Sequence, residues 1–89
     1  MYEIIYTKRI YRDAKRMQKK GYDRELFSKL IKQLKKDVNL PISYRAHKLK
    51  GQWSGYWECH VAFDWLLIYK IEDNDIILYR TGTHQDLFG

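Results

Sequence analysis

The sequence predicts an α+β fold in which a helical hairpin packs on a mainly antiparallel sheet. Three observations support this prediction: a short β-forming run near the start, two segments with apolar residues at helical spacing, and three strand-like runs in the second half. The resulting order of elements is β-α-α-β-β-β. With 89 residues, 45% of them hydrophobic, the chain has material for a single domain over residues 1–89 with one core.

One strand and two helices are predicted in the first half. Residues 2–6 are rich in β-formers and predict the strand. Thr7 is placed to cap the first helix, which runs to the break at Gly21, and Asp23 is placed to cap the second. Because the connection between the helices is short, we expect an antiparallel hairpin. The apolar stripes are Ile10, Tyr11, Ala14 and Met17, then Leu26, Phe27, Leu30, Ile31 and Leu34.

The second half predicts three strands joined by turns. They are expected over residues 56–61, 65–71 and 76–81. Alternation in the first of these places Trp57 and Cys59 in the core and Glu58 and His60 on the other face. The loop before these strands and the tail over residues 82–89 are expected to be irregular. The partly polar face of the sheet is then free to meet a ligand.

Charge is unevenly distributed along the chain. The net charge is +6, but residues 1–36 carry 12 basic and 4 acidic side chains, and residues 37–89 carry 5 and 7. A basic surface of this kind is expected where a protein follows a polyanion such as nucleic acid. Two helices with solvated basic faces would give the same count. No apolar run approaches the roughly 20 residues of a membrane span, and the single cysteine suits a reducing compartment, so we expect a cytoplasmic protein.

Three histidines and one aspartate are candidates for catalysis. They are His47, His60, Asp64 and His84, all in the second half of the chain. Imidazoles suit RNA cleavage by transesterification, because one base must deprotonate the ribose 2′-hydroxyl and one acid must protonate the departing 5′-oxygen. Lys48, Lys50 and Arg80 are candidates to stabilise phosphate charge. Phe88, a large aromatic residue in a polar tail, is a candidate to stack on a base.

The same side chains allow other interpretations. A lone histidine is more often a surface or hydrogen-bonded residue, and Asp64 is also a common type of turn residue. Three histidines and an aspartate are also acceptable zinc ligands, but the spacing from His60 to Asp64 on a strand and turn does not place both on one face. We therefore expect no metal and no cofactor. By default the tryptophans, Trp65 included, belong to the core.

The second half resembles a known toxin family in ordered motifs. These are His47-Lys48-Leu49-Lys50-Gly51-Gln52-Trp53-Ser54-Gly55-Tyr56, Glu58-Cys59-His60-Val61, Asp64-Trp65-Leu66-Leu67-Ile68-Tyr69-Lys70, and Arg80-Thr81-Gly82-Thr83-His84 followed by Leu87-Phe88. Together they resemble the YafQ branch of the RelE toxin superfamily. Over residues 1–43 the resemblance rests only on the β-α-α pattern and basic character.

The resemblance implies a RelE-like fold of the microbial-ribonuclease type and a ribosome-dependent endoribonuclease. Such a toxin enters the A site of the 70S ribosome, cuts messenger RNA and inhibits translation. A cognate antitoxin neutralises it, and operator DNA is contacted only through the antitoxin complex. By motif position the functional set is His47, His60, Asp64, Trp65, His84 and Phe88, which makes Trp65 a substrate-facing candidate. The basic helices are then expected to meet ribosomal RNA.

Two positions depart from the family pattern, and two other functions compete. Trp57 stands where the family commonly has an arginine, and Phe63 stands where it commonly has a proline. The first removes a possible phosphate contact and the second changes the turn before Asp64. The main alternative is a non-enzymatic toxin of the same scaffold that binds a protein target such as gyrase. A general RNA- or DNA-binding domain that relies on the basic helices is the other.

Overall fold

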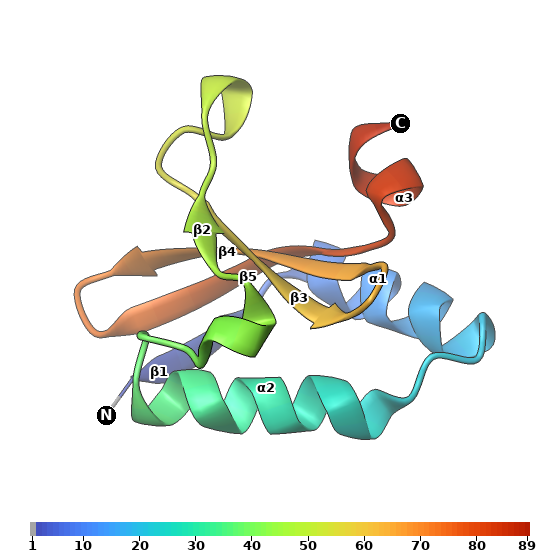
Figure 1. Ribbon diagram of the computed structural model, residues 1–89, viewed down its shortest axis with the longest axis horizontal. Helices are drawn as coiled ribbons and strands as arrows, with labels where there is room; N and C mark the ends of the chain where they lie inside the picture. The colour runs from blue at the N-terminus through green and yellow to red at the C-terminus, as the bar shows by residue number, and fades with distance from the viewer. Residues whose placement is uncertain (1) are drawn as a thin grey trace.

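The computed structural model describes residues 2–89 and contains one five-stranded sheet (Figure 1). The strands lie in the order β1-β5-β4-β3-β2. The elements are β1 (Glu3–Tyr6), α1 (Lys8–Lys19), α2 (Arg24–Lys36), η1 (Ile42–Tyr44), β2 (His47–Lys48), η2 (Gly51–Trp53), β3 (Trp57–Ala62), β4 (Trp65–Glu72), β5 (Asp75–Gly82) and α3 (His84–Phe88). The predicted α+β order is confirmed, and none of the helices in the described part of the chain is long and apolar enough to span a membrane.

The sheet is antiparallel except at one edge. β2, β3, β4 and β5 pair antiparallel, each with its neighbour. β1 pairs parallel with β5, with Glu3 opposite Asp75 and Tyr6 opposite Leu78. The first strand of the chain therefore joins the last one, which the sequence pattern did not indicate.

The helices begin where their capping residues predict. The side chain of Thr7 accepts a hydrogen bond from the backbone N–H of Ile10 at 3.2 Å and donates one to the carbonyl of Leu78 at 2.8 Å. The side chain of Asp23 accepts from the backbone N–H of Glu25 at 2.9 Å. Each bond satisfies an N–H group that has no partner within the helix, so both predicted caps are confirmed.

Both long helices lie on the same side of the sheet and build the core there. In Figure 1, α2 lies below the sheet and α1 behind it, whereas α3 and the connection from β2 to β3 project from the upper side. α1 packs on β5, and α2 packs on β3 and β1. The core unites Ile10, Met17, Leu30, Ile31 and Leu34 of the helices with Cys59, Val61, Trp65, Leu67, Tyr69, Ile76 and Leu78 of the sheet.

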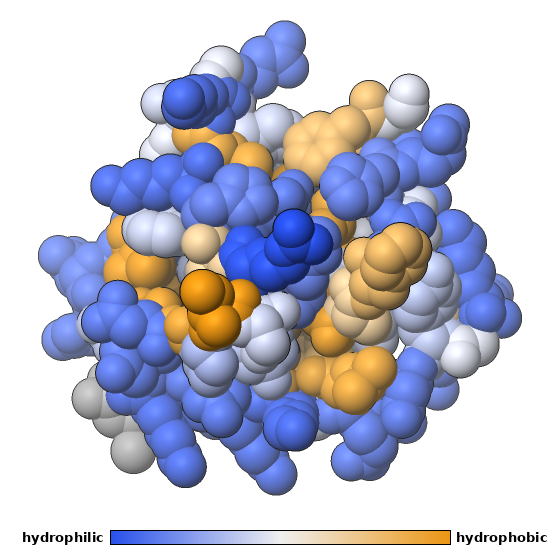
Figure 2. Space-filling view, in the orientation of Figure 1, coloured by the Kyte–Doolittle hydropathy of each residue, from blue (hydrophilic) through white to orange (hydrophobic). Residues whose placement is uncertain are grey.

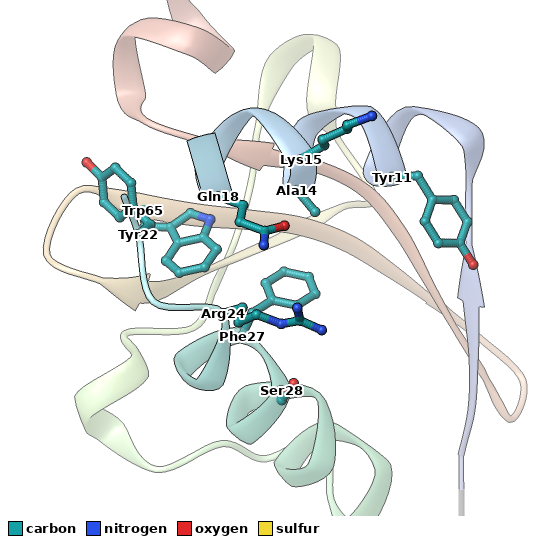
Figure 3. A pocket seen from close by; sticks show the side chains of 9 residues that line it. All are labelled: Tyr11, Ala14, Lys15, Gln18, Tyr22, Arg24, Phe27, Ser28 and Trp65. Carbon is teal, nitrogen blue, oxygen red and sulfur yellow. The ribbon is translucent and has the colours of Figure 1, made fainter. Parts of the chain in front are cut away.

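The two helices are separated by a groove of about 310 Å³ (Figure 3). Trp65 lies on the floor of this groove, with the rings of Tyr22 and Phe27 beside it. The expected hairpin is therefore an open one, because each helix packs mainly on the sheet beneath it.

Two expectations for the irregular segments were wrong. The tail is not irregular, since residues His84–Phe88 form α3. The segment before Gly55 contains the short strand β2, in which His47 pairs with Glu58 and Lys48 with Trp57. Both elements lie on the side of the sheet that the long helices leave uncovered (Figure 1).

Candidate active site

Asp64 and His84 form a hydrogen-bonded pair at the end of the sheet. Asp64 lies in the turn between β3 and β4, and His84 is the first residue of α3. The ring Nδ1 of His84 lies 2.9 Å from Asp64 Oδ1, and the backbone N–H of His84 donates to the same oxygen at 3.2 Å. The two side chains are 61% and 43% exposed, so a ligand from solvent can reach them. With Nδ1 directed at the carboxylate, Nε2 is the ring nitrogen left for a substrate.

The charge of Asp64 is favoured by this arrangement. The side-chain and backbone hydrogen bonds from His84 lower the pKa of Asp64 from its ordinary value. The carboxylate therefore stays ionised near neutral pH, where it orients the imidazole and stabilises its protonated form.

A capping box fixes the position of α3. Thr83 accepts a hydrogen bond from the backbone N–H of Asp86, and Asp86 accepts one from the backbone N–H of Thr83, both at 3.1 Å. Lys20, which follows the last residue of α1, forms a salt bridge with Asp86 at 3.1 Å. The bond from the Thr83 backbone, assisted by Lys20, lowers the pKa of Asp86. His84 is thus held by its own helix as well as by Asp64.

The rings of His60 and Phe88 both lie near that of His84. The ring centroids of His60 and His84 are 6.3 Å apart, and those of His84 and Phe88 are 6.4 Å apart. His60 is half-buried on β3, whereas Phe88 is 47% exposed at the end of α3. The structure thus brings together four of the residues selected from the sequence, namely Asp64, His60, His84 and Phe88.

His47 and Glu58 form a second histidine–carboxylate pair, here called the second histidine pair, on the same face of the sheet. The Nε2 atom of His47 lies 3.2 Å from Glu58 Oε1, and its Nδ1 atom lies 2.9 Å from the carbonyl oxygen of Arg45. Both neighbours are acceptors, so only the protonated ring can donate to the two together. Glu58 is 5% exposed and lies two residues before His60 on β3, or about 7 Å along the strand. Sequence reasoning placed Glu58 on the correct face but missed its contact with His47.

Trp65 is buried on the helix side of the sheet, away from the histidines. Its side chain is only 2% exposed and points to the helix side of the sheet, where Phe27 and Tyr22 pack against it. Its Nε1 donates to the hydroxyl of Thr81 at 2.8 Å. The structure supports the default interpretation of Trp65 as a core residue, and its contact with a substrate stays a prediction.

Arg80 has a protein partner that the sequence did not reveal. Its Nε donates to Asp13 Oδ2 at 2.7 Å and its Nη2 lies 3.4 Å from Oδ1. Asp13 is fully buried and also accepts from the backbone N–H of Thr81 at 3.2 Å. Only 15% of the Arg80 side chain is exposed, and a carboxylate balances its charge. Arg80 therefore has a structural role, and its selection as a phosphate ligand stays a prediction.

The two candidate lysines are exposed near the His47 pair. Lys48 Nζ lies 5.6 Å from the centroid of the Trp57 ring, a cation–π contact. Lys50 is the residue before η2. Trp57, half-buried where the family commonly has an arginine, thus holds a lysine over its ring.

No group of three histidine, cysteine or carboxylate side chains within residues 2–89 is placed to hold a metal ion. Asp64 and His84 are two donors that contact each other, and His47 is held by Glu58 instead. His84 and His47 are therefore each paired with a carboxylate, an arrangement suited to acid–base chemistry.

Comparison with known proteins gives the family of this chain. The family described as the bacterial toxin of type II toxin–antitoxin system, YafQ, matches residues 2–89. The mRNA interferase toxin YafQ of Escherichia coli K12 is 40% identical over 88 residues, which cover 98% of this chain and 96% of that protein. The crystal structure of YafQ from E. coli BL21(DE3) has a TM-score of 0.92 at 37% identity, with both chains fully covered.

Two further structures resemble this chain in other states. A crystal structure of the E. coli DinJ–YafQ complex has a TM-score of 0.90 at 38% identity with both chains fully covered. A metal-bound toxin from Helicobacter pylori has a TM-score of 0.88 at 36% identity, covering 99% of this chain and 100% of that one. The match over residues 2–89 and the full-length relatives agree, and this chain belongs to the YafQ family of bacterial toxins of type II toxin–antitoxin systems.

Proposed function

We propose that this protein is an mRNA interferase, an endoribonuclease that cuts messenger RNA in the ribosomal A site by metal-independent acid–base chemistry. The observation that carries the proposal is the Asp64–His84 pair at 2.9 Å, with the ring of His60 beside it. The names of the relatives support the same activity, since they are mRNA interferase toxins.

The reaction is an internal transesterification. A base removes the proton of the ribose 2′-hydroxyl, the 2′-oxygen attacks phosphorus, and the bond from phosphorus to the 5′-oxygen breaks. An acid gives its proton to that oxygen, so the products are a 2′,3′-cyclic phosphate and a 5′-hydroxyl. We place Nε2 of His84 nearest the reacting phosphate, because it is exposed and oriented by Asp64. His60 shapes the site from the strand, and Phe88 stacks on a base.

His47 supplies positive charge or a proton on the other side of the site. In its protonated form it donates to Glu58 and to the carbonyl of Arg45, two contacts that hold the ring in place. Lys48 and Lys50 lie next to it in sequence and are exposed. These groups, and not Arg80, are the cations that we propose for the phosphate.

The partners follow from the charge and the relatives. We propose that the exposed cations of α1 and α2 contact ribosomal RNA, because a basic surface favours a polyanion. The ribosome would also present the messenger in an ordered form that so small a protein cannot impose itself. The complex of the E. coli relative with DinJ supports neutralisation by a cognate antitoxin.

Cleavage mapping on translating ribosomes tests the proposal. His84→Ala should cut translated messenger about 10²- to 10⁴-fold more slowly, the usual contribution of one acid or base, while it keeps its fold and binds antitoxin. Gln85→Ala, an exposed neighbour in α3, is the matched control and should cut normally. Cutting of the same RNA without ribosomes should be slow, and chelators should not change either rate.

Three results would contradict the proposal. Full activity of His84→Ala would remove the assigned acid or base. Inactivation by a chelator with rescue by zinc would make the same side chains a metal site. Absence of cutting together with inhibition of gyrase would favour the non-enzymatic alternative.

A further inference from the structure

A hollow of about 350 Å³ is lined in part by His60, the residue whose ring lies beside that of His84. Leu26 and Lys29 of α2, residues 43–45 at η1, and residues 60–63 at the end of β3 line it. Figure 2 shows orange apolar side chains beside blue polar ones at the front of the molecule, where η1 lies in Figure 1. His60 therefore borders both the hollow and the Asp64–His84 pair, since the centroid of its ring lies 6.3 Å from that of His84. The hollow is therefore continuous with the proposed site of cleavage.

Phe63 is the unusual residue of this hollow. It is 96% exposed, directly precedes Asp64, and lies on the rim. A phenylalanine on a turn gains nothing from this exposure, and its flat face is free to stack on a ligand. The proline that is common at this position in the family has no aromatic face. The side chain is thus a feature of this chain and not of the shared pattern.

The charges around the hollow favour an anionic ligand. Lys29 and Arg45 line it, together with His60, and no carboxylate does. Arg45 also uses its backbone carbonyl to hold His47, so one residue connects the hollow with the second histidine pair. A flat aromatic face beside two cations and a histidine fits a nucleotide, whose base stacks while its phosphate meets the cations.

The order of contacts places this nucleotide beside the scissile bond. Phe88 contacts His84, His84 contacts His60, and His60 borders the hollow that Phe63 rims. We propose that the hollow is a second nucleotide subsite, in which Phe63 stacks the base on one side of the scissile phosphate while Phe88 stacks the base on the other. This inference rests on the proposed function, because it assumes that the histidines act on RNA.

Three substitutions isolate the ring of Phe63. Phe63→Ala removes the aromatic face, and Phe63→Tyr keeps it. Ile42→Ala is the matched control, because Ile42 is 94% exposed on neighbouring η1 but does not line the hollow. Both positions are almost fully exposed, so none of the variants should change the melting temperature, and this is measured first.

The experiment uses programmed ribosomes with an A-site codon in two forms. One is unmodified and reports the cleavage rate. The other carries a 2′-O-methyl group at the scissile nucleotide and 2-aminopurine at the nucleotide before or after the scissile phosphate. It reports affinity and stacking, because stacking quenches 2-aminopurine fluorescence.

Phe63→Ala should bind this complex about 5- to 150-fold more weakly, the range for loss of one base–aromatic stack, and lose the quenching at one of the two nucleotides. Phe63→Tyr and Ile42→Ala should match the wild type.

The outcomes separate the two proposals. If the wild type cuts no translated messenger, the proposed function fails. If the wild type cuts and Phe63→Ala equals Ile42→Ala in affinity, quenching and rate, the subsite alone is overturned. Weaker antitoxin binding by Phe63→Ala with unchanged cutting and quenching would also overturn it, by making the hollow a protein contact.

Discussion

Replacement of Asp13 by alanine tests the buried ion pair that joins α1 to β5. Asp13 is fully buried and accepts from Arg80 Nε at 2.7 Å and from the backbone N–H of Thr81 at 3.2 Å. The alanine variant leaves both donors without this partner and leaves the Arg80 guanidinium, whose side chain is 15% exposed, without its counter-charge. Loss of one partner of a buried pair costs about 3–5 kcal/mol. Since the free energy of unfolding of a domain is about 5–15 kcal/mol, this loss is a large share of the total.

Urea denaturation followed by circular dichroism measures the loss of unfolding free energy directly. In a thermal melt the same loss should lower the melting temperature by roughly 12–40 °C, at about 4–8 °C per kcal/mol for a domain of this size. Arg16→Ala is the control, because Arg16 meets the same carboxylate at 3.5 Å with 44% of its side chain exposed, and it should lose about 1 kcal/mol or less. A loss below about 1 kcal/mol in Asp13→Ala would refute the reasoning.

A double variant separates the structural role of Arg80 from a role at the phosphate. Asp13→Leu combined with Arg80→Met replaces the whole pair with apolar side chains, which is often neutral for stability. If this variant folds and cuts messenger at the normal rate, Arg80 acts only in the fold. A folded variant that cuts at least tenfold more slowly would restore Arg80 to the site.

Three further predictions concern the site and the core. Gly82→Ala should lower the cutting rate at least about tenfold, because the Cβ of the new alanine would lie 2.9 Å from Asp86 Cβ and must displace α3. A normal cutting rate would show that α3 adjusts freely. In an NMR titration the pKa of Asp64 should lie below its ordinary value near 3.9, so the contact with His84 stabilises the fold above that pH and is lost as the pH falls through the lowered pKa. His84→Ala should raise the pKa of Asp64. An equal pKa in both proteins would contradict the hydrogen bond. Burial raises the pKa of the Cys59 thiol, so a thiol reagent should modify the folded protein only after unfolding, which mass spectrometry detects; rapid labelling would be the contrary result.

Local signals predicted most of the fold. Thr7 and Asp23 cap their helices as expected, since a cap depends on residues within one turn. α3 was missed although its signal is equally local: Thr83 and Asp86 have the spacing of a capping box. β2 and the parallel pairing of β1 were missed for another reason. β1 is paired with a strand at the far end of the chain, and the two residues of β2 are too few to show a periodic pattern of their own.

The same distinction explains the site. His60, Asp64, His84 and Phe88 were selected from residue type and motif resemblance, and the structure brings them together. The buried partners were not foreseen, because 67 residues separate Asp13 from Arg80 and the Glu58–His47 contact needs β2. For Trp65 the simple argument from an apolar strand was better than the resemblance, since burial depends on the neighbours that a residue meets in this chain.

The parallel pairing of β1 with β5 means that the sheet is complete only after nearly the whole domain has been synthesised. Tyr6 pairs with Leu78, 72 residues further along the chain, and contacts between residues so far apart in sequence form slowly. His84 lies two residues beyond Gly82, the last residue of β5, so the contact between Asp64 and His84 also forms only after that strand has been synthesised. A nascent or prematurely terminated chain that stops before residue 84 lacks His84, and one that stops before β5 also lacks the strand that completes the sheet. Under the proposed function, such an incomplete chain lacks a group that is needed to cut messenger RNA.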